Sequence, residues 1–184
     1  MRSALICDGE PGIRSSLKNK LKELGFEEIL ECGDGGAAVE TAWAHNPDIA
    51  ILDILNGMGA AREIRQKLKI PVILLTACCD QETVHKARKI GVTAILVKPF
   101  RGQELLPAIE MAFAHTEEVE ILKENVKDLT VTIETRRLID KAKALLMSSQ
   151  GLYPFEAFRR IQKQALAKQT SMRKIAEAVL LTEG

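Results

Sequence analysis

Four polar side chains stand where short apolar runs of the sequence end. In chain order they are Asp8, Asp53, Thr76 and Lys98. If the runs are parallel strands, their carboxyl ends converge on one crevice. Two carboxylates can share a divalent cation, while a hydroxyl and an ammonium can contact a phosphoryl group. A single acid at a strand end more often caps a helix, but four suitable types in series predict a site that binds a phosphoryl group.

The apolar runs that carry these residues alternate with segments of helical spacing. Strands are expected at 3–8, 28–32, 49–53, 72–76 and 94–97. A first helix is expected to end at Gly25, and four further helices are expected at 36–45, 60–68, 80–91 and 103–115. Three of the strands are continuously apolar, as in a parallel sheet covered on both faces. Five strand–helix units in about 115 residues predict a doubly wound, flavodoxin-like α/β domain with a five-stranded parallel sheet.

The charge of the chain is uneven, although its total is only +1. Residues 135–184 hold ten basic against four acidic residues, a net +6, whereas 117–134 are net −4 and 1–116 net −1. A basic end of this kind is typical of polyanion binding, and nucleic acid is the first candidate. Expected phosphate donors are Lys143, Arg159, Arg160, Lys163, Arg173 and Lys174, and Tyr153 or Gln164 are expected to reach bases.

Composition excludes several other classes of protein. No apolar run reaches the roughly 18–20 residues that span a bilayer, and residues 1–8 do not read as a secretory signal. The four cysteines lack a CxxC spacing, so we expect them to be small buried side chains in a reduced, cytoplasmic setting. No nucleophile–base pair or glycine-rich phosphate loop is present, and an enzyme is not expected.

From residue 117 the pattern changes to a heptad seam. Five apolar residues recur at spacings of 3, 4, 3 and 4, namely Val119, Leu122, Val126, Leu129 and Ile133. We expect this seam to form a parallel homodimer; the alternative is an amphipathic helix folded back on the α/β domain. Because no Gly or Pro interrupts 117–150, the helix is expected to run to Gly151.

Two shorter helices are expected after Gly151. Pro154 suits the first position of one helix, and Thr170 or Ser171 caps the next. The first of them carries the apolar residues Phe155, Phe158, Ile161 and Leu166. The expected organisation is an α/β domain at 1–116, a coiled-coil linker at 117–134 and a small three-helix domain at 135–184.

Residues 1–115 resemble a response-regulator receiver domain. The resemblance rests on LICDGEP, ILDI, ILLTA and VKPF, which together span the domain. It implies that Asp53 accepts a phosphoryl group from a histidine kinase, that Thr76 and Lys98 contact that group, and that acids after the first strand help to hold Mg²⁺. It also implies a cis Lys98–Pro99 peptide bond.

The chain departs from the receiver family at three places. Gly9 stands where the family has a second acid, which leaves Asp8, Glu10 and Asp53 as metal ligands. The segment after Asp53 is about four residues shorter than the usual loop, and Ile95 replaces an aromatic residue. Losing a carboxylate weakens the binding of a hard cation. We therefore expect weak or absent Mg²⁺ binding and weak phosphorylation, unless Glu10 replaces the missing acid.

The segment from Arg136 to Leu180 resembles the ANTAR domain, the RNA-binding output of the AmiR and NasR antiterminators. The matching features are Ala142-Lys143, Leu146-Met147, Gly151, Glu156-Ala157-Phe158, Ala165 and Ile175-Ala176. Tyr153-Pro154 departs from the family's usual Ser-led helix start. The resemblance implies binding to paired hairpin loops in a nascent leader transcript, which prevents a terminator from forming.

These features favour a cytoplasmic, dimeric transcription antiterminator with an atypical receiver. Its expected partners are leader RNA, a second copy of the chain, and a sensor histidine kinase or a sequestering protein, with no membrane. One alternative is a DNA-binding response regulator, for which 168–171 would form the turn of a helix-turn-helix. The other is an adaptor that sequesters a protein and binds no nucleic acid.

Overall fold

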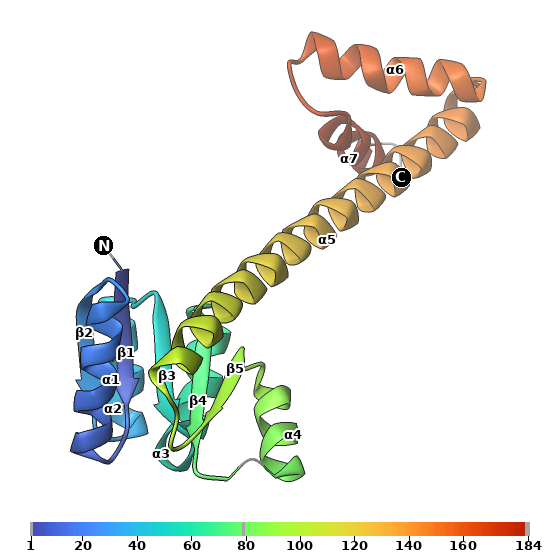
Figure 1. The fold of residues 1–184 in the computed structure, drawn as a ribbon. Helices are drawn as coiled ribbons and strands as arrows, with labels where there is room; N and C mark the ends of the chain where they lie inside the picture. The colour runs from blue at the N-terminus through green and yellow to red at the C-terminus, as the bar shows by residue number, and fades with distance from the viewer. Residues whose placement is uncertain (1, 79, 183–184) are drawn as a thin grey trace. The chain divides into compact units, whose positions relative to one another are not determined.

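The computed structural model describes residues 2–78 and 80–182, and the described residues divide into two compact units between Glu120 and Ile121. The first unit contains a five-stranded, fully parallel sheet in the order β2-β1-β3-β4-β5 (Figure 1). The predicted doubly wound fold is confirmed. Lys98–Pro99 is a cis peptide bond, as expected.

The elements follow the predicted alternation of strands and helices. The strands are β1 (Arg2–Cys7), β2 (Phe26–Cys32), β3 (Ile49–Asp53), β4 (Val72–Thr76) and β5 (Ala94–Val97). The helices are α1 (Pro11–Glu23), α2 (Gly35–His45), α3 (Ile54–Lys67), α4 (Gln81–Ile90), α5 (Gly102–Gln150), α6 (Pro154–Ala167) and α7 (Met172–Thr182).

Alternate residues of each strand face two separate cores, because successive side chains of a strand point to opposite faces. In β1, Leu5 and Cys7 pack in the core that α2, α3 and α4 cover, whereas Ala4 and Ile6 pack in the core beneath α1 and α5. β3 and β4 are buried along their whole length. This two-sided burial explains why their sequences are continuously apolar.

Local capping places α4 where it was predicted. The Asp80 side chain accepts a hydrogen bond from the Thr83 N–H at 2.7 Å, and this bond lowers the pKa of the Asp80 carboxyl. Gly91 closes the helix in the left-handed region, with φ of 82°, a conformation that glycine adopts without a steric penalty. Both ends depend on interactions within a few residues.

Helix α3 differs from the sequence prediction. It begins at Ile54 rather than at residue 60, so no loop separates it from β3. Asp53 caps the helix by accepting a hydrogen bond from the Leu55 N–H at 3.0 Å. The glycines that read as loop residues are required by packing. A Cβ on Gly57 would lie 2.8 Å from Leu52 Cβ, and one on Gly35 would lie 2.1 Å from the Asn56 carbonyl oxygen.

Helix α5 is continuous across the position where two helices were distinguished in the sequence. It runs for 49 residues from Gly102 to Gln150. In the first half of the helix, Glu120 forms an ion pair with Lys69 of the same unit at 3.2 Å. Within the described residues, no helix has an apolar stretch long enough to cross a membrane.

The core of the second unit is small and rich in alanine. Its fully or almost fully buried side chains are Ala142, Leu146, Ala157, Ile161, Ala165, Ile175 and Ala176. Of the four apolar residues predicted on α6, only Ile161 is buried; Phe155, Phe158 and Leu166 are exposed. The reason is that α6 uses its alanine face, which allows close approach, to contact its neighbours.

The helix ends of the second unit lie where they were expected. Gly151 follows α5 with φ of 66°, and Pro154 opens α6. The Ser171 hydroxyl accepts a hydrogen bond from the Lys174 N–H at 3.3 Å and so identifies the cap of α7. At the start of α6 the Tyr153 N–H donates a hydrogen bond to the Glu156 carboxylate at 2.9 Å. Glu156 therefore stabilises the first turn of the helix, where Tyr153-Pro154 replaces the family's usual Ser.

The cysteines differ in their exposure. Cys7 and Cys32 are buried partners in the β1–β2 register, as expected, but Cys78 is exposed in the segment after β4. Cys79 lies outside the described residues. Burial raises the pKa of the Cys7 thiol from 9.0 to about 12, and nearby Cys32 and Asp34 add to the effect.

The raised Cys7 pKa predicts sensitivity to alkaline pH. The folded state keeps the Cys7 proton between pH 9.0 and about 12, whereas the unfolded state loses it. The thiol's contribution to stability is therefore complete below pH 9 and decreases above it, by about 1.4 kcal/mol per pH unit. Above pH 9, the free energy of unfolding measured by denaturant titration should therefore fall more steeply with pH for the wild type than for Cys7→Ala, by this amount per pH unit. Equal slopes above pH 9 would contradict the prediction.

Candidate functional site

The four polar residues predicted from the strand ends converge at the carboxyl edge of the sheet. Lys98 Nζ lies 2.5 Å from Asp8 Oδ2 and 2.6 Å from Asp53 Oδ1, so one ammonium bridges both acids. Asp8, Asp53 and Thr76 are each at most 5% exposed. Buried charges of this kind persist only when they are paired.

The remaining polar atoms of the site are also hydrogen-bonded. Asp8 Oδ1 accepts from the Glu10 N–H at 2.9 Å, and Asp53 Oδ2 accepts from the Leu55 N–H at 3.0 Å. The Thr76 hydroxyl donates to the Cys78 carbonyl at 2.6 Å. Arg14 donates to the Asp8 carbonyl at 2.7 Å. Each carboxylate therefore has one oxygen held by the backbone and one held by Lys98.

Electrostatics keep Lys98 protonated. Burial of the ammonium would lower its pKa, but hydrogen bonds and charge attraction from Asp53 and Asp8 outweigh that effect and raise it. The Lys98 ammonium is therefore retained between the two carboxyl side chains.

A pocket of about 380 Å³ opens over these residues. Its lining also includes residues that the sequence interpretation did not include, namely Leu55, Asn56, Cys78 and Thr83. Leu55 is 86% exposed at the start of α3. Asn56 lies beside Gly9, because a Cβ on Gly9 would be 3.2 Å from Asn56 Nδ2. Recognising that α3 begins directly after Asp53 would have identified both residues.

The described residues fit a hard divalent cation poorly. In 2–78 and 80–182, no three His, Cys, Asp or Glu side chains are grouped to hold a metal ion. Glu10 lines the pocket but is exposed. Since α3 begins at Ile54, the carbonyls that follow Asp53 point along the helix axis rather than lying in a loop. Mg²⁺ prefers six oxygen ligands in near-octahedral geometry.

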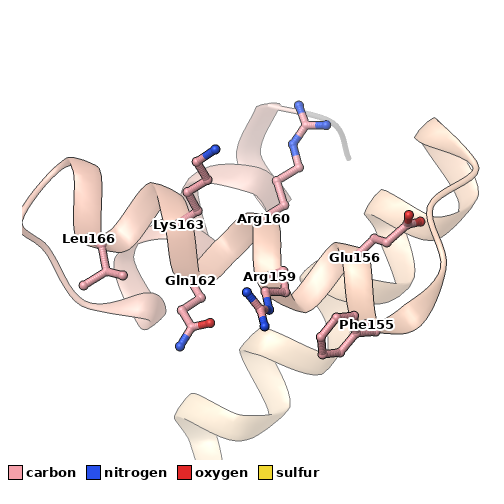
Figure 2. A pocket seen from close by; sticks show the side chains of 7 residues that line it. All are labelled: Phe155, Glu156, Arg159, Arg160, Gln162, Lys163 and Leu166. Atoms are coloured by element: carbon pink, nitrogen blue, oxygen red, sulfur yellow. The ribbon is translucent and has the colours of Figure 1, made fainter.

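Helix α6 brings three of the predicted basic residues together. Arg159, Arg160 and Lys163 line a groove of about 570 Å³ along this helix. Figure 2 shows that Arg160 and Lys163 point to one side of α6, while Arg159 lies against Phe155 on another. Glu156 is the one acidic residue among the seven that line the groove.

The other residues predicted to contact nucleic acid lie apart from this groove. Lys143 is paired with Asp140 at 3.0 Å, and Arg173 is paired with Glu177 at 3.0 Å. Gln164 lines a second pocket among α5, α6 and α7, which Arg160 also lines. Tyr153 is 75% exposed just before α6, and Lys174 is exposed on α7. The structure therefore divides the predicted set among several surfaces.

The residues of the predicted seam lie on α5 and are largely exposed. Leu122, Val126, Leu129 and Ile133 are 55%, 63%, 63% and 54% exposed, and Val119 is half-buried. Contiguous exposed apolar side chains usually mark an interaction site.

The sheet order and the polar set at its carboxyl edge define a receiver-type domain of the doubly wound class. Comparison with known families agrees, because the "Response regulator receiver domain" family matches residues 4–110 and the "ANTAR domain" family matches residues 127–180. The chain belongs to the response regulators that combine a receiver with an ANTAR domain. Receiver domains typically bind Mg²⁺ at an acidic site, and the family is regulatory.

Among individual proteins, one relative matches the whole chain, and solved structures match its receiver part. The "Transcriptional regulatory protein PdtaR" of Mycobacterium tuberculosis is 41% identical over 187 residues, covering 100% of this chain and 91% of the relative. The chemotaxis protein CheY4 of Vibrio cholerae matches with a TM-score of 0.57 and 26% identity, over 61% of this chain and 98% of that one. A DNA-binding response regulator of the LuxR family from Staphylococcus aureus matches with a TM-score of 0.57 and 27% identity, over 61% and 99%.

Proposed function

We propose that this response regulator is a transcription antiterminator that binds hairpins in nascent leader RNA through its ANTAR domain. The observation that carries the proposal is the ANTAR match at 127–180 together with the exposed basic groove on α6. The net +6 of residues 135–184 supports binding to a phosphate backbone. The LuxR-family match covers the receiver fold, and so gives no support to a DNA-binding output.

The protein acts as a parallel homodimer through α5. In the heptad, Val119, Val126 and Ile133 occupy a positions and Leu122 and Leu129 occupy d positions. β-branched residues at a with Leu at d favour two parallel strands. In that register Glu118 at g faces Lys123 at e of the second copy, a pair of opposite charges, and the exposed seam supplies the apolar contact.

The receiver is an atypical switch that receives its signal from a sensor histidine kinase. Asp53 is the proposed phosphoacceptor, with Thr76 and Lys98 contacting the phosphoryl group. Two features support weak binding of Mg²⁺: the absent acid at Gly9, and the start of α3 directly after Asp53. With fewer ligands for the metal, the incoming phosphate meets two poorly neutralised carboxylates.

Crosslinking of the protein to RNA in cells, followed by sequencing of the bound transcripts, tests the proposal most directly. Enriched hairpins in leader regions support antitermination. Competition binding, in which structured RNA and duplex DNA compete for the purified protein, distinguishes the RNA-binding proposal from the DNA-binding alternative. An adaptor without nucleic-acid binding would give no enriched transcript and no salt-dependent affinity for either competitor.

The basic groove predicts a specific change in RNA binding. Replacing Arg160 and Lys163 by alanine should lower the affinity on the order of tenfold near physiological salt, because two phosphate contacts are lost. The log–log slope of affinity against salt should become shallower by roughly 1.5–2. Lys67→Ala, an exposed change in the first unit, is the matched control. Unchanged affinity in the folded double variant would remove both residues from the interface.

A further inference from the structure

The outward face of α6 carries a stripe of four side chains that do not contribute to the core. Phe155, Arg159, Gln162 and Leu166 follow at spacings of 4, 3 and 4, which places them within about 60° of one another around the helix. All four are exposed and line the α6 groove; Phe155 and Leu166 are 66% and 75% exposed. The buried face of α6 is formed by Ala157, Ile161 and Ala165, so the aromatic ring and the leucine on its outward face are free to contact a partner.

The chemistry of this stripe is mixed rather than continuously apolar. The Arg159 guanidinium lies over the Phe155 ring, 5.1 Å from its centroid, within the range of a cation–π contact. Gln162 offers both a donor and an acceptor of hydrogen bonds. Leu166 lies about 16 Å along the helix from Phe155. In Figure 2, Phe155, Arg159 and Gln162 follow one another along α6.

Charge indicates which kind of partner this face binds. Arg159, Arg160 and Lys163 line the groove against the single acid Glu156. The fully buried core of a protein interface is mostly apolar and poor in charged residues, whereas here a guanidinium and an amide separate the two apolar residues. Aromatic rings, guanidinium planes and adjacent cations are the combination that holds unpaired nucleotides.

We propose that the Phe155–Arg159 pair is a stacking platform for an unpaired RNA base, and that Gln162 contacts a base edge beside it. Arg160 and Lys163, on the neighbouring side of α6, then hold the phosphates on either side of that base. The inference rests on the proposed RNA-binding function and assigns the reading of bases to the outward face of α6. Tyr153 and Gln164, named from the sequence for this role, lie outside the stripe.

The test uses the full-length protein and a hairpin RNA that the wild type selects from a pool with a randomised loop. Phe155→Ala should weaken binding of this hairpin on the order of tenfold, the loss expected for one stacked base. The salt slope should stay unchanged, because no phosphate contact is lost. Phe155→Trp should restore the affinity. Leu181→Ala, which removes another exposed side chain (86%) from α7, is the control.

A fluorescent base analogue, 2-aminopurine, at successive loop positions provides a second readout. At one position the wild type and Phe155→Trp should quench its fluorescence, and Phe155→Ala should not. If Phe155→Ala binds like Leu181→Ala while the Arg160/Lys163 double variant is weakened, the platform is wrong and RNA binding stands. If the wild type selects no RNA, both proposals fail. If Phe155→Ala changes only the sedimentation coefficient, the stripe is a contact between proteins and the platform is wrong.

Discussion

Leu129→Lys is expected to convert the protein from a dimer to a monomer. The substitution removes one leucine per copy from the centre of the proposed seam, at roughly 1.5–3 kcal/mol each, and places two like charges opposite each other. The dimer dissociation constant should rise on the order of 1,000-fold. Analytical ultracentrifugation across a concentration series measures the change.

The same helix supplies a matched control for this variant. Val131 is 44% exposed and lies at an f position, away from the seam, so Val131→Lys should leave the dimer intact. The pair Glu118 and Lys123 tests the orientation. Glu118→Lys should weaken a parallel dimer, and adding Lys123→Glu should restore it. If Leu129→Lys remains dimeric, the two copies associate through another surface.

Gly9→Asp is expected to create a competent metal site in the receiver. The new carboxylate joins Asp8 and Asp53, and a side chain at this position meets only the flexible end of Asn56, at 3.2 Å. Mg²⁺ affinity should rise on the order of 100-fold, because a nearby carboxylate attracts a divalent ion by a few kcal/mol after solvent screening. Isothermal titration with Mg²⁺ measures this directly.

Phosphorylation of the same variants tests the proposed acceptor. With Mg²⁺ and acetyl phosphate, the wild type should show little mass increase, Gly9→Asp should gain one phosphoryl group, and Gly9→Asp with Asp53→Asn should gain none. Gly9→Asn, which has the same shape without the charge, should behave like the wild type. Stoichiometric phosphorylation of wild-type Asp53, together with tighter RNA binding, would show that the receiver is an ordinary switch.

The sequence predicted those features that depend on local interactions or on a regular period. Asp80 and Gly91 delimit α4 through contacts within a few residues, so both ends were predictable. The sequence also predicted that four polar side chains meet at one edge of the sheet, because parallel strands direct their carboxyl ends to the same edge. These side chains are Asp8, Asp53, Thr76 and Lys98.

Features that depend on distant packing were not predictable in the same way. Gly35 and Gly57 lie outside the helices predicted from the sequence. Gly35 allows the start of α2 to approach Asn56 on α3, and Gly57 allows the first turns of α3 to pack against Leu52 of β3. On α6, the apolar residues form two stripes, and periodicity cannot distinguish the buried stripe from the exposed one. The alanines, which carry the weaker hydrophobic signal, form the buried face.

The alanine core has a consequence for how this family can diversify. Ala157 and Ala165 hold the inner face of α6 against its neighbours, where any larger side chain would separate the helices. The outer face of the same helix contributes little to folding, since its side chains project into solvent. Substitutions there are nearly free of a folding penalty. The outer face of α6 can therefore acquire substitutions that change which ligand it binds, while the inner face must keep small residues for the domain to fold.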